Sequence, residues 1–557
     1  MTRLTTLATW LVLGVVLVCG AAAAGNEGDR TGGDRVVIGE SSGRAAPTGD
    51  LAPGAQIVRG GQPISVAEAI ALAIRNSLDV EVERYAPLLA QSSADAAWGA
   101  YDPIIAAVMQ YDVAKSPNTF ALNAAAANRE RNKGGSVGFT QAVPLLGVEL
   151  SATYAASSQS TRSTIQSFDE QFNSSFFLEA TVPLMQGLIW NREWTNVKIG
   201  DARLGSVRED FRARVMDVVT STVNAYWNLV AERDRVRVAQ KSLDTARALL
   251  DQTETQFEVG VVSRVDVVEA EAGVAEREFD VISRANGYRN AQDILIDVTL
   301  GPQLAALTDL EFAPSDDPDR YEMQRVDVGR AVDEAFVNRP ELKSLTKRIE
   351  EGRLEVKFAK NQMLPTLDAN VRFGYVGVSG EPNAGLSPVF GTPPPSAPFD
   401  QSDDAFFTSD GSDNFRVMGT FSIPFPNTVA RKRATQRELE LKRTKTERVR
   451  LEQRIIVEVR SAARTLVASS QGIEAAERRR LAAEEQLRAE RIRLEHGEST
   501  PFQVLEKERE LVEAESQKIG ALQTFRAAEV GLERAMGTIL DIRGIEIDEV
   551  ERGPDSK

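Results

Sequence analysis

The chain contains two copies of one pattern, and this internal repeat constrains its architecture more than any other feature. The segment from Val66 to Asn76 resembles the segment from Val328 to Asn338. Further on, FEVGVVSRVDVVEAE (257–271) resembles LEHGESTPFQVLEKE (494–508), with Gly260 matched to Gly497. Because the matching segments recur in the same order, the sequence predicts two structural repeats, 64–301 and 328–537, joined by a linker at 302–327.

Each repeat shows the same order of periodicities: a helix, strands, a long helix and a short helix. An apolar seam with alternating spacings of three and four residues marks the long helices, for example at Ala239, Leu243 and Ala246. The predicted elements are a helix at 66–98 and 328–362, strands at about 103–185 and 365–425, a long helix at about 188–258 and 428–495, and a short helix at about 264–299 and 501–536.

The short helix after Gly260 continues the apolar seam and predicts an antiparallel hairpin. At 1.5 Å per residue a long helix of this length spans on the order of 100 Å, and the short helix covers about half of it. We therefore expect the opening and the closing helix of each repeat to stack end to end beside the long one. This arrangement puts the strands at one end of a rod and the two glycine turns at the other. The seam residues on the first short helix are Val265, Val268, Ala272, Ala275, Phe279 and Ile282.

The strands alternate strictly between apolar and polar residues. In PTLDANVRFGYV, for example, Val371, Phe373 and Tyr375 share one face and Arg372 the other. Such strands with long polar loops are typical of a membrane β-barrel, which must be closed to satisfy its backbone in lipid. We expect about four strands per chain, or six if a further hairpin near 136–156 joins them. Since such barrels begin at about 8 strands, the sequence predicts a shared barrel of twelve strands in three chains, or eighteen with the hairpin.

Composition excludes several functions. With one histidine (His496) and one cysteine (Cys19), a transition-metal site or a histidine- or thiol-based catalytic site is not expected, and no nucleotide-binding glycine motif is present. The net charge of −16 disfavours a nucleic-acid binder. The basic run at 430–433 is interpreted as a solvated helix face, and the aspartates of the 379–413 loop, including Asp403 and Asp410, as a solvated loop. We expect no enzyme activity, no metal and no cofactor.

The N-terminal segment has the pattern of a secretory signal peptide at 1–24, with an apolar core and an Ala-rich exit. Lipidation at Cys19 is an alternative, although the preceding Val18 is larger than such a site prefers. Residues 25–63 are then an N-terminal periplasmic extension, and 538–557 a C-terminal tail.

These segments resemble the TolC-like outer-membrane efflux proteins of Gram-negative bacteria. The resemblance spans about 64–540 and rests on VAEAIALAIRNSLDVEV, AAWGAYDPIIAAVMQY, VPLMQG, AYWNLVAERDRV and, above all, FEVGVVSRVDVVEAE. It implies an α+β membrane protein: a homotrimer whose β-barrel lies in the outer-membrane lipid and continues as a long α-helical barrel across the periplasm. It also implies an exit duct for tripartite efflux or type I secretion, linked by a periplasmic adaptor protein to an inner-membrane transporter.

The resemblance implies two sets of site residues at the glycine turns. The turns themselves would bind the adaptor, and nearby acidic side chains would form a pore gate. Gln503 departs from this pattern, because the family often has an aspartate there. The adaptor-binding set is Val259, Gly260, Val261, His496, Gly497 and Glu498, and the gate set is Asp266, Glu269, Gln503 and Glu506.

Physical chemistry alone leaves the role of these residues open. Ser263 with Asp266 predicts a capping box, and Thr500 followed by Pro501 predicts a second helix start. Capping does not require Glu269, so a gate, a helix cap, or both remain possible roles for the acidic residues. A periplasmic or surface coiled-coil scaffold without a pore is the alternative for the whole protein.

Overall fold

The computed structural model describes residues 61–117, 127–161, 166–301, 311–321, 326–386, 392, 394–404, 406 and 413–547. All of them belong to one unit, Val58–Lys557. The predicted signal peptide, nearly all of the predicted extension, residues 548–557 of the tail, parts of the linker and Asp410 lie outside the described residues.

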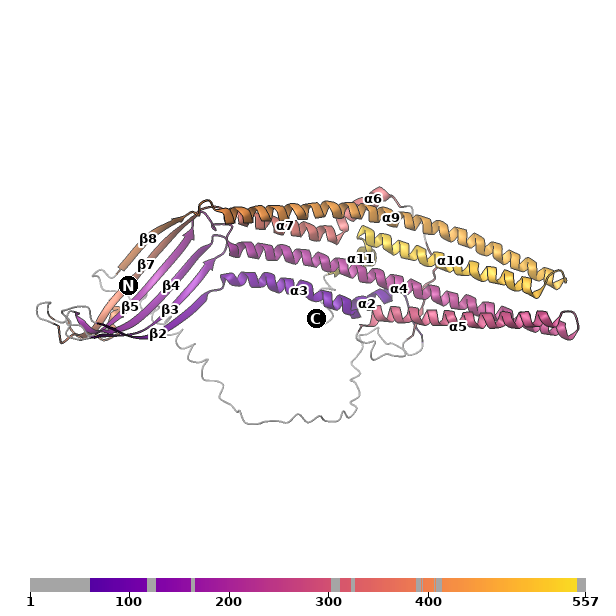
Figure 1. Ribbon diagram of the computed structural model, residues 1–557, viewed down its shortest axis with the longest axis horizontal. Coiled ribbons are helices and arrows are strands. Elements are labelled where there is room, and N and C mark those ends of the chain that lie inside the picture. The colour runs from indigo at the N-terminus through magenta and orange to yellow at the C-terminus, as the bar shows by residue number, and fades with distance from the viewer. Residues whose placement is uncertain are drawn as a thin grey trace, which may run out of the picture. The chain divides into compact units, whose positions relative to one another are not determined.

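The two repeats place long strands before a long helix and its return helix (Figure 1). The first repeat and the segment before it contain β1 (Gln62–Ile64), α2 (Val66–Asn76), α3 (Leu78–Trp98), the 3-10 helix η1 (Gly99–Tyr101), β2 (Ile104–Pro117), β3 (Ala127–Val143), β4 (Val148–Thr161), β5 (Phe168–Pro183), α4 (Arg192–Glu258) and α5 (Arg264–Leu300). The linker and the second repeat contain β6 (Phe312–Pro314), α6 (Val328–Asn338), α7 (Pro340–Asn361), β7 (Thr366–Pro382), α8 (Gln401–Asp404), β8 (Asp413–Ser422), α9 (Thr428–Glu495), α10 (Pro501–Met536) and α11 (Ile539–Ile542).

The opening helix of each repeat is broken, which corrects the prediction of single helices at 66–98 and 328–362. Ser77 and Arg339 adopt extended backbone angles between the two halves. Pro340 follows Arg339 and disfavours helix at the preceding residue. Each return helix ends against the break: a Cβ on Gly301 would clash with the carbonyl oxygen of Asn76, and one on Gly537 would lie 2.9 Å from the amide nitrogen of Arg339.

The long helices α4 and α9 contain 67 and 68 residues and organise a layer of helices. Both α3 and α5 contact α4, and both α7 and α10 contact α9. The contacts of α4 with α7 and α10 join the two repeats. The sheet lies at one end of these helices and the two turns at the other (Figure 1). Among the described residues, no helix is both long and apolar enough to cross a membrane.

The seam predicted on α5 does not pack inside the chain. Val265 and Phe279 are 65% and 72% exposed, whereas Val267 and Ala270 are buried. The seam on α4 was predicted correctly for Ala239, Leu243 and Ala246, which are buried. The chain thus packs α5 through a less apolar stripe and leaves the more apolar stripe uncovered. Single-sequence periodicity finds the apolar stripe, but it does not decide which neighbour covers it.

The six-stranded sheet has the strand order β2-β3-β4-β5-β7-β8, with neighbouring strands antiparallel. The hairpin that the sequence left open, β3–β4, lies in the centre of the repeat-1 strands, so that of the two predicted numbers, about four or six, the sheet has six. The first repeat supplies four of the strands and the second supplies two. Strands β2 and β8 are the edges of the sheet.

Near the helix end of the sheet, the register separates an apolar face from a more polar one. On the polar face the sheet is hollowed over small residues, including Gly134, Ser136, Ala155 and Ser157. One row of paired residues on the apolar face is Ile105, Phe139, Ala152, Leu178, Phe373 and Phe415, and the next row, on the polar face, is Ile104, Thr140, Ser151, Glu179, Arg372 and Arg416.

A short parallel sheet, β1 with β6, fastens the start of the first repeat to the linker. Tyr226, which is buried in α4, donates a hydrogen bond of 2.6 Å to Asp316 Oδ2. The same carboxylate oxygen accepts from the backbone N–H of Val66 at 2.8 Å. On the other side of the linker, Lys518 of α10 pairs with Asp319 at 3.2 Å. The described part of the linker therefore contacts the helices of both repeats.

Candidate functional site: the helical tips

The turn between α4 and α5 (the first tip) is closed by Gly260. Its φ of +83° is strained for other residues, whereas nothing lies within 4 Å of a Cβ built on it. The amide of Val261 donates to the carbonyl of Gln256 at 2.9 Å, and that of Gly260 donates to Phe257 at 2.9 Å. This pair of bonds is a Schellman motif, which satisfies the last carbonyls of α4. The glycine is thus required by the backbone and not by packing.

The turn between α9 and α10 (the second tip) repeats this geometry. Gly497 has a φ of +76° and is equally free of neighbours. The amide of Glu498 donates to the carbonyl of Arg493 at 2.8 Å, and that of Gly497 donates to Leu494 at 3.0 Å. His496 lies beside it, with Nδ1 2.7 Å from the carbonyl oxygen of Ile492. Two sequences with little in common therefore form the same Schellman turn.

The two return helices begin with different caps. Ser263 and Asp266 form the predicted capping box, in which Asp266 Oδ2 accepts from the Ser263 amide at 2.8 Å and from its hydroxyl at 2.7 Å. These hydrogen bonds hold the pKa of Asp266 below its usual range. At the second tip, Thr500 Oγ1 accepts from the Gln503 amide at 3.4 Å, and Pro501 occupies the first helical turn. Only the first cap contains an ionisable group.

Both tips present side chains to solvent. Val259 and Val261 are 71% and 72% exposed, although valine is an apolar residue. Glu498 and His496 are also exposed at the second tip. Exposed valines on both sides of Gly260 give the first tip an apolar end that nothing in the described chain covers.

The four candidate gate residues do not form one cluster within the chain. Asp266 bonds to Ser263, and Gln503 Oε1 accepts from the Ser499 hydroxyl at 2.8 Å. Glu506 pairs with Arg509 at 3.3 Å. Glu269 is exposed, and no polar partner of it lies among the described residues. No group of three or more acidic, His or Cys side chains suited to a metal ion occurs in the described part of the chain.

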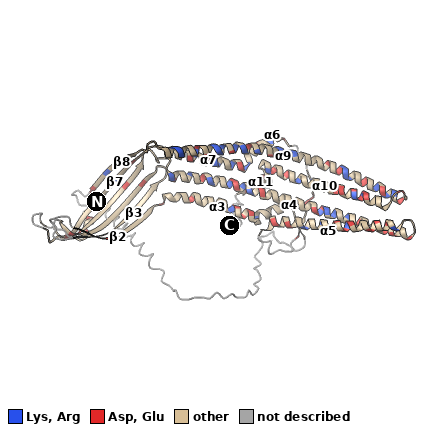
Figure 2. Cartoon of the chain, in the orientation of Figure 1, with Lys and Arg blue, Asp and Glu red and all other residues tan. Residues whose placement is uncertain are grey.

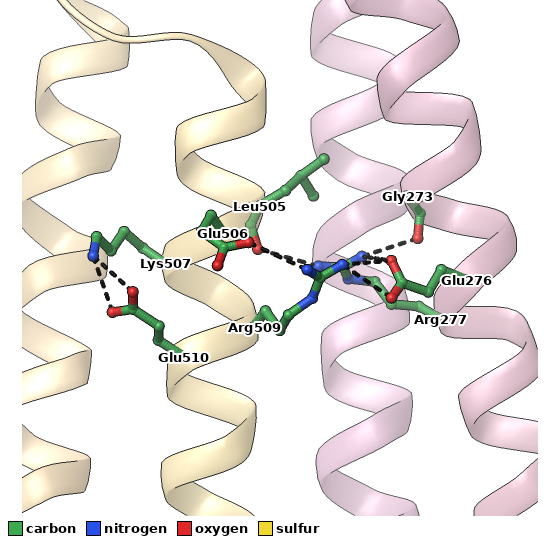
Figure 3. Close-up of polar contacts among 8 residues, drawn as sticks. All are labelled: Gly273, Glu276, Arg277, Leu505, Glu506, Lys507, Arg509 and Glu510. Carbon is green, nitrogen blue, oxygen red and sulfur yellow. Dashed lines mark hydrogen bonds and ion pairs between the residues drawn. The ribbon is translucent and has the colours of Figure 1, made fainter.

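Arginines on α5 and α10 connect the two hairpins about three turns from the tips (Figure 3). Arg509 of α10 donates to both carboxylate oxygens of Glu276 on α5, at 2.9 and 2.8 Å. Arg277 of α5 donates to the carbonyl of Gly273 at 3.1 Å and to that of Leu505 on α10 at 3.3 Å. Glu506 therefore shares Arg509 with Glu276, so that one exposed arginine faces two exposed carboxylates.

The sequence analysis missed the buried charges Arg277 and Glu508, which are 5% and 3% exposed. Burial raises the pKa of Glu508, and the charges of Arg277 and Arg491 partly offset this effect. The signal was present in the repeat: Arg277 occupies the position of Ala514, which is fully buried in α10. The first repeat therefore makes a buried polar contact at this position, and the second repeat, which has an alanine there, does not.

Solved outer-membrane channels share this architecture. The channel CmeC of Campylobacter jejuni superposes with a TM-score of 0.59 over 87% of this chain and 87% of that one, at 14% sequence identity. Among curated proteins, the outer membrane protein TolC of Salmonella enteritidis is 22% identical over 363 residues, 65% of this chain and 69% of TolC. TolC of Escherichia coli K12 is 23% identical over 367 residues, with the same coverage. The fold is therefore that of an outer-membrane channel.

The family model described as "Outer membrane efflux protein" matches residues 117–298 and 331–538, which is most of the chain. The chain belongs to this family. It is an outer-membrane efflux channel protein of the Gram-negative envelope that extends into the periplasm. The resemblance drawn from the sequence motifs is confirmed.

Proposed function

We propose that three copies of this chain close their sheets into one barrel and form a passive exit duct. The observation that carries this proposal is the sheet itself: one face is apolar near the helices, and the edges β2 and β8 have no further strand partner among the described residues. An open edge in lipid leaves backbone groups without hydrogen bonds, at several kcal/mol each. Three copies of a six-stranded sheet supply eighteen strands, which is within the range of outer-membrane barrels.

The helices support the same assembly. The uncovered stripe of α5 includes Phe279 and Ile282, at 72% and 67% exposed. On the far side of the helix layer, α9 exposes Val457 and Leu481, at 65% and 48%. Because α5 and α9 both leave apolar side chains uncovered, α9 of one copy is suited to pack against α3 and α5 of the next.

In this duct substrates pass from the periplasm to the exterior without energy input by the channel. The energy comes from an inner-membrane transporter, and a periplasmic adaptor protein links the two, as in tripartite efflux or type I secretion. The adaptor binds at the tips, through Val259, Gly260 and Val261 of the first and His496, Gly497 and Glu498 of the second. The exposed valines favour this, since a partner that covers them removes apolar surface from water.

Asp266, Glu269, Gln503 and Glu506 form the periplasmic gate of the trimer. Asp266 has two roles, because its carboxylate both caps α5 and adds negative charge at the entrance. Glu269 is one turn further along α5 and is free to face the pore. Rings of carboxylates at a narrow entrance favour cations.

The test is single-channel recording of the purified protein in a planar bilayer. Replacing Asp266, Glu269 and Glu506 by Ala is expected to lower cation selectivity, because three carboxylates per copy leave the entrance, and to raise conductance, because the smaller alanine side chains widen it. The control replaces Asp280, Asp293 and Asp297 by Ala, three exposed carboxylates on α5 far from the tip. Equal selectivity in both variants contradicts the gate. A protein that forms neither trimers nor channels in detergent or lipid contradicts the duct and supports a coiled-coil scaffold.

A further inference from the structure

Tryptophan gathers where the sheet meets the helices. Of the five tryptophans in the sequence, Trp98 ends α3, Trp190 precedes α4 and Trp194 lies in its first turn. Trp98 packs edge-on against Trp194, with ring centroids 6.0 Å apart, and remains 44% exposed. Partly exposed tryptophans at the end of an apolar surface are typical of a membrane–water interface.

Cations lie over aromatic rings at the same level. Lys357 Nζ is 4.9 Å from the ring centroid of Trp190, and Lys198 Nζ is 4.7 Å from that of Trp194. Lys198 also pairs with Asp201 at 3.7 Å. Long basic side chains beside interfacial tryptophans keep their charge in the headgroup region while their stems lie on apolar groups.

The basic run of α9 adds charge that the chain does not neutralise. Arg431, Lys432 and Arg433 are exposed, and no ion pair joins them to a carboxylate among the described residues. The first acidic residue of α9 is Glu438, and it pairs with Lys360 at 2.8 Å. Figure 2 shows Lys and Arg gathered at the sheet end of α9. Cations near a helix N-terminus oppose the helix dipole, so helix formation does not account for the run.

Apolar residues lie on the sheet side of these groups. Phe425, between β8 and α9, is 94% exposed, and Val429 in the first turn of α9 is 64% exposed. Leu145 and Leu184, which follow β3 and β5, are 44% and 48% exposed. From the sheet towards the helices the surface therefore passes from apolar residues to a level that holds both aromatic and cationic residues, which is the order of acyl chain and headgroup in a lipid leaflet.

We propose that this junction belt, defined as Trp98, Trp190, Trp194, Arg431, Lys432 and Arg433, binds the headgroups of anionic phospholipids in the leaflet that faces the periplasm. The inference rests on the proposed membrane position of the sheet. Charge complementarity selects anionic over zwitterionic headgroups, since each cation near an anionic membrane surface adds a favourable electrostatic contribution to binding. The exposed apolar residues beside the run, Phe425 and Val429, distinguish a lipid surface from an interface with a soluble acidic protein, which offers no acyl chains.

The experiment uses native mass spectrometry of the full-length protein in detergent micelles. It measures the preference of the protein for bound phosphatidylglycerol over phosphatidylcholine of the same chain length. The variant carries Arg431→Gln, Lys432→Gln and Arg433→Gln. The control carries Arg450→Gln, Arg460→Gln and Arg464→Gln, three exposed cations of the same helix without an ion pair in the described chain. We expect the variant to lose the preference for phosphatidylglycerol by about tenfold or more and the control to keep it.

Three results overturn the inference: a variant with the wild-type preference, a control that loses as much as the variant, or equal competition by inorganic phosphate at the same concentration. Channel recording of the same protein distinguishes failure of the lipid-binding inference from failure of the proposed function. A wild-type protein that conducts but shows no lipid preference contradicts the belt alone, whereas one that does not insert contradicts the duct.

A second measurement leaves the charges unchanged. In vesicles, lipids brominated near the headgroup are expected to quench the tryptophan fluorescence of the wild type. Replacing Trp98, Trp190 and Trp194 by Phe removes the quenched emission, and Trp227→Phe leaves it, because Trp227 is buried further along α4. Stronger quenching by bromine at the chain centre contradicts an interfacial belt.

Discussion

The two repeats agree at their tips and differ in their sheets. Gly260 and Gly497 close the same Schellman turn, each followed by a side-chain cap. In the sheet, the first repeat supplies four strands and the second supplies two. A chain reversal between antiparallel helices has few low-energy backbone solutions, so both repeats adopt the same one. Strand number is less constrained, because inserting a hairpin preserves the alternation of faces.

The largest expected effect is on the width of the barrel. Deleting residues 127–161, which contain β3 and β4, leaves two strands in each repeat. The register pairs Ile104 with Thr140, Thr140 with Ser151 and Ser151 with Glu179, so Ile104 and Glu179 lie on the same face. Strand β2 can therefore pair with β5 without inverting the sheet. In the proposed trimer, twelve strands in place of eighteen reduce the barrel circumference by about a third and its cross-section to about 0.4 of the original.

The measurement is the largest polyethylene glycol that enters the channel from the barrel side in a planar bilayer. We expect this size limit to fall in the deletion variant. The cation selectivity that we propose for the gate at the tips should stay the same and serves as the internal control. An unchanged size limit would show that β3 and β4 do not line the barrel.

The next largest expected effect is a loss of stability of α5 and α10 when Arg277 is replaced by Met. The first repeat has this buried arginine where the second has Ala514, and the substitution leaves Glu508 buried with less compensating charge. Loss of one member of a buried charge cluster costs about 3 kcal/mol. Hydrogen exchange along α5 and α10 should increase accordingly.

The matched control is Arg509→Met, which removes an exposed bridge to Glu276 between the same helices. Exposed ion pairs contribute about 1 kcal/mol or less. The double variant Arg277→Met with Glu508→Gln should recover much of the loss, because it removes both buried charges. Equal effects of Arg277→Met and Arg509→Met would contradict a special role for the buried arginine.

The sequence predicted those parts of the fold that local periodicity determines. Alternation located the strands, and the glycine turns with Ser263 and Thr500 located the tips. It did not predict the breaks at Ser77 and Arg339, although Pro340 was visible, since a helical pattern continues on both sides. The close approach of Gly301 to Asn76 joins residues far apart in sequence, which no window detects.

The same limit applies to the site. The capping box of Ser263 and Asp266 follows from spacing alone and was predicted correctly. The contacts of Arg277 with Leu505 and of Arg509 with Glu276 depend on how α5 faces α10. The apolar stripe of α5 predicted the wrong buried side, because periodicity identifies an apolar stripe without identifying which neighbour covers it.

The smallest expected effect is a pH dependence of the helix cap at the first tip that the second tip lacks. The pKa of Asp266 is lowered in the folded state by hydrogen bonds from Ser263, so its contribution is fully present above the ordinary pKa of about 4. It is lost as the pH falls through the lower pKa of the folded state. At the second tip, Thr500 and Gln503 take the places of Ser263 and the titrating Asp266, so the cap of α10 should not depend on pH. Hydrogen exchange in the first turn of α5, corrected for intrinsic rates, should therefore rise below about pH 4, while that of α10 stays constant. In Asp266→Asn this pH dependence should disappear, and its persistence would assign the change to another group.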